Sequence, residues 1–415
     1  MKFGLIGNKL KKSYSKIIHE ELSTNTYELW NLKSDEFTNF ITQKKFDGIN
    51  VTIPYKEKVI PFLDYIDDEA KAIGCINTIK KVNGKLYGYN TDAFGFSSLL
   101  DYFNVDVKNK NVLILGTGAT SKTVNYVLLK RKVNKVTFVS RSHKDNSVTY
   151  DEALSFTDTN IIINTTPYGM NQTVDKTSLL SLNSFINLET VIDVIYNPLR
   201  TPLLIEAKEK GCKAYSGLYM LVAQAIKSHE IFTNHIFNKE IIAKIYKSLL
   251  LKECNIVFIG MPSCGKSTAS NIISRILCKE RIDIDEEIEQ QYDLSICEIF
   301  KIKGENYFRE LETSIIKSVF NHNGKIISLG GGSLLKKENI PFILKNSLLI
   351  FLDRDLSLLK ANQNAIKSRP LLKDDNSFDK LFKERYPLYL RYADIVIKNN
   401  GSHHDTKKLI LEKLL

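Results

Sequence analysis

The sequence contains no pair of cysteines in a C-x-x-C arrangement, no internal repeat and no low-complexity stretch. Its six cysteines are scattered, which suits reduced thiols in a cytoplasm better than disulfide bonds or a zinc site. No apolar run approaches the length of a membrane span, and the chain opens without a basic and apolar leader. These absences predict a cytoplasmic globular protein with no secretory signal and no membrane partner.

Basic residues are in excess, with 58 lysines and arginines against 47 aspartates and glutamates and a formal net charge of +11. The lysines are mixed with acids and form no basic run. We therefore expect a solvated surface that suits anionic substrates, and no nucleic-acid partner. A length of 415 residues predicts two or three domains. The sequence leaves the oligomeric state open, a homo-oligomer included.

A phosphate-binding pattern, G-x-x-x-x-G-K-[ST], occupies residues 260–267. An apolar run at 255–259 predicts a buried strand before it, and residues 269–277 have helical spacing after it. The glycines let backbone N–H groups turn toward phosphate oxygens, and the helix offers its positive N-terminal end. Lys266 is expected to reach the β- and γ-phosphates of ATP, and Ser267 to hold Mg²⁺. The predicted nucleotide ligands are Gly260, Ser263, Cys264, Gly265, Lys266, Ser267 and Thr268.

Strand and helix signals alternate through the first hundred residues, which predicts an α/β domain. Small polar side chains and a charge follow apolar strands at two places, one containing Lys56 and the other Asp92. Open α/β sheets bind their ligands at such strand ends. The two residues are candidates for an amine–carboxylate pair, with Asn77 and Thr91 as neutral hydrogen-bond partners. A surface salt bridge with turn-forming neighbours is the alternative.

A second strand–loop–helix unit begins with an apolar run at residues 111–115. Gly116 and Gly118 follow it, before a helical stretch at 122–131. A glycine pair at this place permits a pyrophosphate to approach the N-terminus of the helix. A further strand at 135–139 completes a βαβ unit of the size that dinucleotide-binding domains require.

That strand ends in Ser-Arg-Ser, where an NAD enzyme typically carries an acid for the ribose diol. Arg141 instead suits the 2′-phosphate of NADP, and Ser140, Ser142 and Lys144 are expected to add contacts. A solvated arginine at a strand end is the alternative interpretation.

A resemblance to shikimate dehydrogenase rests on three segments: residues 50–56, Asn77-Thr78 and residues 90–95. It continues to about residue 245 and implies two lobes around a cleft, one of them a Rossmann NADP-binding domain. The implied reaction is the reduction of 3-dehydroshikimate to shikimate with NADPH, with Lys56 and Asp92 at the reacting carbonyl. The substrate-binding residues that the resemblance implies are Ser13, Ser15, Thr52, Asn77, Tyr196 and Gln224.

The N-terminal loop departs from the pattern of that family. The family usually has Gly-x-Pro and then His-Ser-x-Ser-Pro, whereas lysines stand here at positions 9, 12 and 16 in place of both prolines and the histidine. Both serines are kept, so carboxylate binding is still expected, from a loop that is less rigid and more positive.

The resemblance also covers the loop at 161–170 and the helix at 217–224. It implies a substrate-binding lobe at 1–100, completed by 218–250, and an NADP-binding domain at 101–217. The cofactor-binding residues that follow are Gly116, Gly118, Ala119, Thr120, Ser121, Ser140, Arg141, Ser142, Gly217 and Met220. For Met220, core packing is the competing explanation.

A second set of motifs follows the phosphate-binding loop. Residues 281–285 are expected to form a strand on which Asp283 and Asp285 share a face, for Mg²⁺ and for a reacting hydroxyl. The later motifs are Phe-Arg-x-x-Glu at 308–312, Gly-Gly-Gly at 330–332, Arg-Pro-Leu-Leu at 369–372 and Arg-Tyr-Pro-Leu-Tyr at 385–389. Together they resemble shikimate kinase over residues 254–415. This implies a P-loop kinase with a parallel sheet that phosphorylates the 3-hydroxyl of shikimate with Mg-ATP.

The kinase resemblance also implies roles for single residues. Shikimate would be held by Asp285, Arg309, Arg385 and the backbone of Gly331, because paired guanidinium groups suit a carboxylate. Asp285 would also activate the attacking hydroxyl, while Arg369 and Lys266 would neutralise charge on the phosphoryl group. Asp283 would join Ser267 at the metal. The chain has Asn362 and Gln363 where relatives often carry an arginine that stacks on adenine.

Two alternatives to a bifunctional enzyme stay open at this point. In one, the altered loop with Lys9, Lys12 and Lys16 has disabled the first half, which then serves as a scaffold or regulator of the kinase. In the other, the first half is a quinate-type or NAD-using dehydrogenase.

Overall fold

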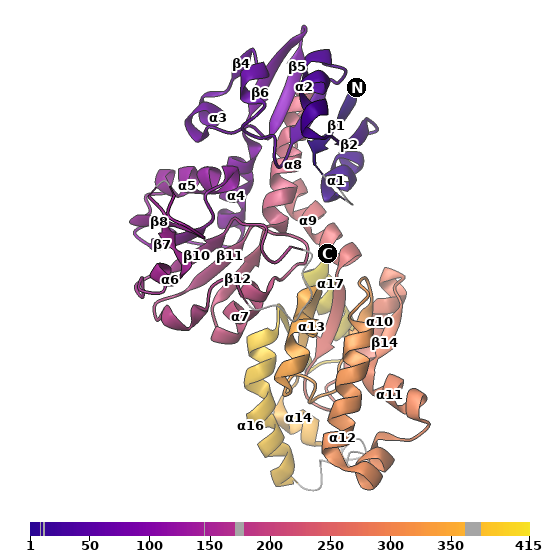
Figure 1. The fold of residues 1–415 in the computed structure, drawn as a ribbon. Coiled ribbons are helices and arrows are strands. Elements are labelled where there is room, and N and C mark those ends of the chain that lie inside the picture. The colour runs from indigo at the N-terminus through magenta and orange to yellow at the C-terminus, as the bar shows by residue number, and fades with distance from the viewer. Residues whose placement is uncertain (9, 11–12, 145, 171–177, 362–374) are drawn as a thin grey trace. The chain divides into compact units, whose positions relative to one another are not determined.

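The structure is a computed structural model that describes all residues except 9, 11–12, 145, 171–177 and 362–374. The chain divides into two compact units (Figure 1). Unit 1 comprises residues 1–170, 178–196 and 212–246, and unit 2 comprises residues 171–177, 197–211 and 247–415. Of the helices in the described ranges, none has the length and apolarity that crossing a membrane requires.

Unit 1 begins with a six-stranded sheet in the order β2-β1-β3-β5-β6-β4. Strands β1, β2 and β3 are parallel, while β5 is antiparallel to both β3 and β6. The strands are β1 (Lys2–Gly7), β2 (Thr26–Asn31), β3 (Gly48–Val51), β4 (Tyr65–Ile66), β5 (Thr78–Val82) and β6 (Lys85–Tyr89). Apolar residues on these strands form a core with helix α2, so the alternation predicted for this region is confirmed.

Helices and one short 3-10 turn accompany this sheet. They are α1 (Tyr14–Leu22), α2 (Ser34–Gln43), η1 (Ile60–Phe62), α3 (Asp68–Ile73), α4 (Thr91–Tyr102) and α8 (Leu218–Thr233). Helix α9 (Glu240–Glu253) follows α8 in the chain. Asn90 caps α4 by accepting a hydrogen bond from the Ala93 amide, which fixes where Asp92 stands in the first turn. Helix α4 packs along α8.

The second sheet of unit 1 is parallel, in the order β12-β11-β10-β7-β8-β9. Its strands are β7 (Asn111–Leu115), β8 (Lys135–Ser140), β9 (Val148–Thr149), β10 (Ile161–Asn164), β11 (Thr190–Asp193) and β12 (Lys213–Ser216). The remaining elements here are α5 (Ala119–Lys130), α6 (Tyr150–Ala153) and η2 (Leu182–Ser184). This doubly wound arrangement is the predicted Rossmann domain.

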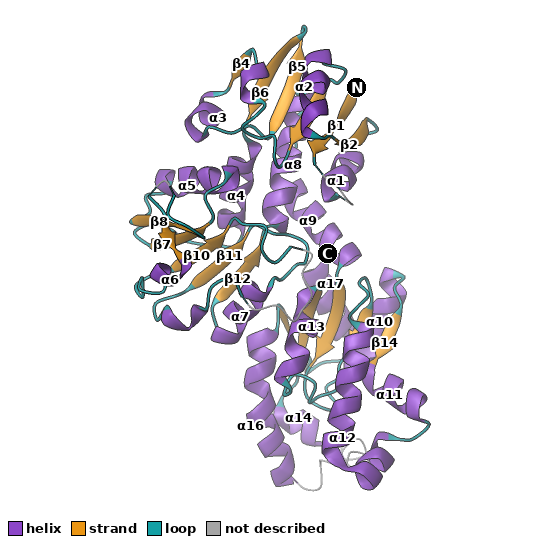
Figure 2. Ribbon diagram, viewed as in Figure 1, coloured by secondary structure: helices purple, strands orange, loops and turns teal. Residues whose placement is uncertain are grey.

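Unit 2 is built on a five-stranded parallel sheet in the order β14-β15-β13-β16-β17, flanked by helices (Figure 2). The strands are β13 (Asn255–Ile259), β14 (Arg281–Asp283), β15 (Ile326–Ser328), β16 (Ser347–Asp353) and β17 (Ile395–Lys398). The helices are α7 (Pro202–Lys210), α10 (Lys266–Leu277), α11 (Ile284–Tyr292), α12 (Ile296–Val319), η3 (Lys337–Asn339), α13 (Ile340–Lys345), α14 (Leu356–Ala361), α16 (Asp375–Tyr392) and α17 (His403–Leu414). The predicted parallel sheet is thereby confirmed.

Two features of unit 2 differ from the sequence-based expectations. The strand expected at 281–285 ends at Asp283, whose carboxylate accepts a hydrogen bond from the Asp285 amide and so caps α11. Asp285 therefore lies in the first turn of a helix, because a capping carboxylate favours a helix start over a longer strand. In addition, residues 197–211, which the sequence analysis assigned to the NADP-binding domain, pack with unit 2.

Candidate active sites

Lys56 and Asp92 form a close ion pair in unit 1, as predicted. The distance from Lys56 Nζ to Asp92 Oδ2 is 2.5 Å, and the two side chains are 13% and 10% exposed. Burial by itself lowers the pKa of Lys56, but the charge of Asp92 and the hydrogen bond to it outweigh burial and raise that pKa. The amine thus remains protonated at neutral pH.

A buried hydrogen-bond network surrounds this ion pair. The side-chain amide of Asn77 donates to Asp92 Oδ1 at 3.0 Å, to Thr91 Oγ1 at 2.9 Å and to Gln224 Oε1 at 3.3 Å. The network joins Gln224, which the family resemblance implied, to Asn77, Thr91 and Asp92, and it holds Asp92 in one orientation.

Sequence reasoning missed Ser228, which also belongs to this network. Ser228 is fully buried on α8, with its hydroxyl 2.7 Å from that of Thr78 and 2.9 Å from that of Thr91. It also accepts a hydrogen bond from the side-chain amide of Asn50 at 2.8 Å. A signal was available, because Ser228 follows Gln224 by four residues and so shares its helix face.

The serines predicted to bind a carboxylate lie at the start of α1. Ser13 caps the helix, accepting a hydrogen bond from the Ser15 amide at 3.3 Å, and Ser15 is 7% exposed. The Tyr14 ring between them lies 5.5 Å from the ring of Tyr196, which brings that residue to α1. Thr52 directly follows β3 and donates its amide to Ile6. A positive helix end with hydroxyl groups suits an anion.

The loop between β7 and α5 has the space that a pyrophosphate needs. Gly118 is the N-cap of α5, and no atom lies within 4 Å of the position where a Cβ would stand. The Ser121 hydroxyl donates to the Gly118 carbonyl at 2.6 Å. The amides of Ala119 and Thr120 belong to the first turn of α5, where backbone N–H groups have no partner within the helix. This geometry fits the predicted dinucleotide, with Gly116 at the end of β7.

The end of β8 presents positive charge. Strand β8 ends at Ser140, and Arg141 and Ser142 are exposed beyond it. Residues 140–144 contain no acid, so the segment fits a 2′-phosphate better than a free ribose diol. Gly217 is the N-cap of α8, and a Cβ at this position would lie 2.1 Å from the Val194 carbonyl oxygen, so only glycine fits. Met220, in the first turn of α8, is 6% exposed.

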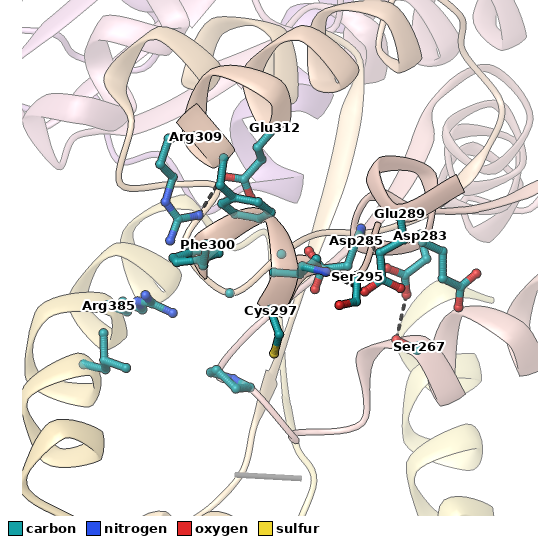
Figure 3. A pocket seen from close by; sticks show the side chains of 18 residues that line it. Ser267, Asp283, Asp285, Glu289, Ser295, Cys297, Phe300, Arg309, Glu312 and Arg385 are labelled. Carbon is teal, nitrogen blue, oxygen red and sulfur yellow. Dashed lines mark hydrogen bonds and ion pairs between the residues drawn. The ribbon is translucent and has the colours of Figure 1, made fainter. Parts of the chain in front are cut away.

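A pocket in unit 2 gathers the residues predicted to bind shikimate and the metal (Figure 3). Although Asp283 and Asp285 do not share a strand face, both line this pocket, one at the end of β14 and the other on α11. Its wall also includes Ser267, Arg309, Glu312, Arg385 and the glycines at 330–332. Carboxylates and guanidinium groups therefore face one small cavity.

Two arginines lie at one end of this pocket, and they differ in their partners. Arg309 donates to Glu312 Oε2 at 2.7 Å, whereas Arg385 is 4% exposed and its Nε has no hydrogen-bond partner among the described residues. A buried guanidinium with an unmet donor is a suitable ligand for a carboxylate. The backbone carbonyl of Gly331 accepts a hydrogen bond from the Tyr389 hydroxyl at 2.5 Å.

The loop at 260–268 has the conformation that phosphate binding requires. Gly260 and Gly265 have φ of 146° and 96°, which turns the loop back on itself. Lys266 Nζ donates to the carbonyls of Gly260 at 3.1 Å and Met261 at 3.0 Å, so the ammonium lies over the loop. The Ser267 hydroxyl donates to Asp283 at 2.7 Å, which pairs the two predicted metal ligands. Residues 263, 264 and 268 lie in the same turn and helix start.

Sequence reasoning missed a second surface beside this loop. A small pocket there is lined by Thr268, Asn399, His403, Thr406 and Lys407, among others. The Asn399 side-chain amide donates to the Cys264 carbonyl at 2.6 Å and so joins the end of β17 to the loop. The signal was the polar Asn-Asn-Gly run after an apolar strand, which places side chains at the ligand-binding edge of the sheet.

Several residues named in the sequence analysis lie outside the described residues. These are Lys9, Lys12, Asn362, Gln363 and Arg369. The roles that the family resemblance implies for them remain predictions.

The fold and these sites define a chain with two nucleotide-dependent active sites, one of the dinucleotide-binding oxidoreductase type and one of the P-loop phosphotransferase type. The family models agree. A model of the shikimate dehydrogenase substrate binding domain matches residues 5–79, and one of shikimate kinase matches residues 262–415.

Relatives of known name cover the first part of the chain. A shikimate dehydrogenase (NADP(+)) of Staphylococcus epidermidis is 39% identical over 251 residues, which are 56% of this chain and 93% of that protein. The chain belongs to the shikimate dehydrogenase family and carries a shikimate kinase domain at its C-terminal end. The resemblance proposed from sequence is confirmed.

Solved structures give the same result. Shikimate dehydrogenase 1 from Peptoclostridium difficile has 37% sequence identity and a TM-score of 0.56, over 60% of this chain and 98% of that chain. A shikimate 5-dehydrogenase from Thermus thermophilus, in complex with NADP(H) and shikimate, has 27% identity and a TM-score of 0.54, over 60% of this chain and 99% of that chain.

Proposed function

We propose that the protein is a bifunctional enzyme of aromatic amino-acid biosynthesis. It reduces 3-dehydroshikimate to shikimate with NADPH in unit 1 and phosphorylates the 3-hydroxyl of shikimate with Mg-ATP in unit 2. The observation that carries this proposal is the presence, in one chain, of the buried Lys56–Asp92 pair and of the acid- and arginine-lined pocket beside Lys266. The product of the first reaction is the substrate of the second.

In unit 1, bound NADPH supplies the hydride that reaches the ketone carbon. Lys56, held in its charged form by Asp92, donates a hydrogen bond to the ketone oxygen and then the proton that the new hydroxyl requires. Asn77, Thr52 and Gln224 orient the other hydroxyl groups. Ser13, Ser15 and Tyr196 receive the carboxylate at the start of α1.

Cofactor binding in unit 1 is assigned to the two loops described above. The pyrophosphate binds at the α5 N-terminus through Gly116, Gly118 and the amides of residues 119–121. Arg141, with Ser140 and Ser142, would hold the 2′-phosphate, and Gly217 and Met220 would contact the nicotinamide. The absence of an acid at residues 140–144 supports NADP over NAD.

In unit 2, Mg-ATP supplies the phosphoryl group. Asp285 accepts the proton of the attacking 3-hydroxyl, while Arg309, Arg385 and the backbone of Gly331 hold the shikimate carboxylate and ring. Lys266 and Arg369 stabilise the charge on the transferred group. Ser267 and Asp283 hold the metal.

The two alternative functions have less support. A disabled first half would not need to retain a buried ion pair whose carboxylate is oriented by Asn77. An NAD-using enzyme would be expected to carry an acid directly at the end of β8, where Ser140 and Arg141 stand.

Two single substitutions test the proposal. Lys56→Ala should lower NADP-dependent shikimate oxidation by about 10²–10⁴-fold, because the general acid is lost, and spare ATP-dependent phosphorylation. Lys266→Ala should lower phosphorylation at least about 10²-fold and spare the oxidation. Steady-state assays of both reactions on each variant give the measurement.

Lys58→Ala and Lys301→Ala, which remove exposed lysines of the two units, are the matched controls. The proposal fails if the unmodified protein acts on neither compound. Loss of both activities in either test variant would contradict independent sites.

A further inference from the structure

Ser333 immediately follows the glycine turn of the unit 2 pocket and is fully buried. Its hydroxyl donates to Glu312 Oε1 at 2.6 Å and lies 3.0 Å from the Gly330 carbonyl. A hydroxyl has one proton to donate, and an ionised carboxylate is the stronger acceptor. The hydrogen bond to Glu312 is therefore the principal contact of this side chain.

Glu312 has no exposed surface, and its two oxygens have different partners. Oε1 accepts from Ser333, and Oε2 accepts from Arg309 at 2.7 Å. Because the carboxylate is planar, fixing one oxygen fixes the direction of the other. The serine hydroxyl consequently sets the angle at which Glu312 meets the guanidinium of Arg309.

The same three residues are packed against the glycine turn itself. A Cβ at Gly330 would lie 2.7 Å from Glu312 Oε1 and 2.8 Å from Asp285 Oδ1. The Arg309 guanidinium lies against Gly332. A further hydrogen bond fixes the end of this turn, because the Asn339 side-chain amide donates to the Ser333 carbonyl at 2.9 Å.

We propose that Ser333 is a positioning residue for substrate binding in unit 2, where it orients Arg309 through Glu312. This inference rests on the proposed kinase function. Without the hydroxyl, Glu312 keeps only the arginine as a side-chain partner and can rotate. Arg309 then depends on its longer contact with the exposed Glu305, at 3.3 Å, and its direction toward the substrate carboxylate is less fixed. Binding of shikimate is weakened, whereas the groups that transfer the phosphoryl group are not touched.

The test is the steady-state kinetics of the intact chain carrying Ser333→Ala. The KM for shikimate should rise about tenfold, the loss expected when a hydrogen bond to a buried charge is removed. The kcat should change by less than about twofold, and the KM for ATP and the dehydrogenase activity of the same preparation should be unchanged, which a general loss of folding would not allow.

Ser347→Ala is the matched control. Ser347 is also a fully buried serine of unit 2, but its hydroxyl has no hydrogen-bond partner among the described residues. Its removal should leave the KM for shikimate unchanged. If Ser333→Ala does not fold, Ser333→Cys decides, because the thiol keeps the shape but donates weakly and should give an intermediate KM.

A double-mutant cycle separates positioning from packing. In a Glu312→Gln background, Ser333→Ala should raise the KM by less than about twofold, because the carboxylate through which it acts is gone. An unchanged KM in Ser333→Ala, or a full tenfold effect in the Glu312→Gln background, would overturn the inference. Failure of the unmodified chain to phosphorylate shikimate would instead overturn the proposed function.

Discussion

At the residue scale, the least expected feature is a contact between two buried histidines in the core of unit 1. His19 on α1 and His229 on α8 place their Nδ1 atoms 2.9 Å apart, and the His19 ring stacks on that of Tyr27. One nitrogen must donate and the other accept, so the accepting ring is neutral. Burial, together with the neighbouring His229, lowers the pKa of His19. Burial, together with His235, lowers the pKa of His229 to about 4.

This pair predicts a pH-dependent stability for unit 1. Above pH 6.5 the rings are neutral in the folded and unfolded states alike. Between about pH 6.5 and 4 the unfolded state binds protons that the folded state excludes, so the free energy of unfolding falls, by at most about 1.4 kcal/mol per pH unit for each histidine. His229→Gln should make this dependence less steep.

The single tryptophan, Trp30, lies on β2 and allows urea unfolding of unit 1 to be followed by fluorescence between pH 7.5 and 5. His143→Gln, at an exposed histidine, is the control. A slope that is equal in His229→Gln and the unmodified chain would show that the pair does not titrate in this way.

At the scale of elements, helix α12 is interrupted at Gly304, where φ is 82° and ψ is 173°. Ile296, Cys297 and Phe300 line the pocket from the segment before the break, and Arg309 and Glu312 from the segment after it. The Phe-Arg-x-x-Glu motif at 308–312 thus lies in the second of two helical segments, which Gly304 joins. Because of this break, residues from both segments of α12 line the same cavity.

Gly304→Ala should therefore destabilise unit 2 by about 1–3 kcal/mol, because this backbone region is almost closed to residues with a Cβ. No atom lies within 4 Å of the added methyl group, so the cost is one of backbone conformation and not of space. Urea unfolding followed by loss of kinase activity measures it. The neighbouring Lys303→Ala is the control, and equal stability of the two variants would mean that the break is not required.

Local sequence signals predicted the central strands well and the strand ends less well. The runs at 111–115 and 255–259 are strands with those bounds, because a short apolar run bounded by loop residues is typical of a strand that is buried on both faces. The error at 281–285 arose where two interactions compete: the pattern suited a strand, but the Asp283 carboxylate caps a helix.

At the scale of the whole chain, residues 197–211 connect β11 to β12 in the sequence, and yet they pack with unit 2. Arg200 and Lys208 of this segment both lie 2.6 Å from Asp394 Oδ1. Burial would raise the pKa of Asp394, but the two cations outweigh it and hold that pKa below its usual range. Arg200 also donates to the carbonyls of Leu344 and Ser347.

Arg200→Met should lower the unfolding free energy of unit 2 by about 3 kcal/mol, because it leaves a buried carboxylate with one cation. The kinase activity remaining after equilibration in urea reports this change. Lys210→Met alters an exposed lysine of the same segment, at the end of α7, and should have no effect. If both variants resist urea equally, residues 197–211 do not contribute to unit 2 in the way described.

The sequence alone determined the fold class, the two nucleotide-binding loops and the identity of the two families, because these depend on short motifs and on the period of apolar residues along the chain. Tertiary structure alone decided that Ser228 contacts Thr91, that Ser333 contacts Glu312 and that residues 197–211 pack with unit 2. Such contacts join residues remote in the chain, whose proximity depends on the packing of whole helices and sheets. No local pattern encodes that packing.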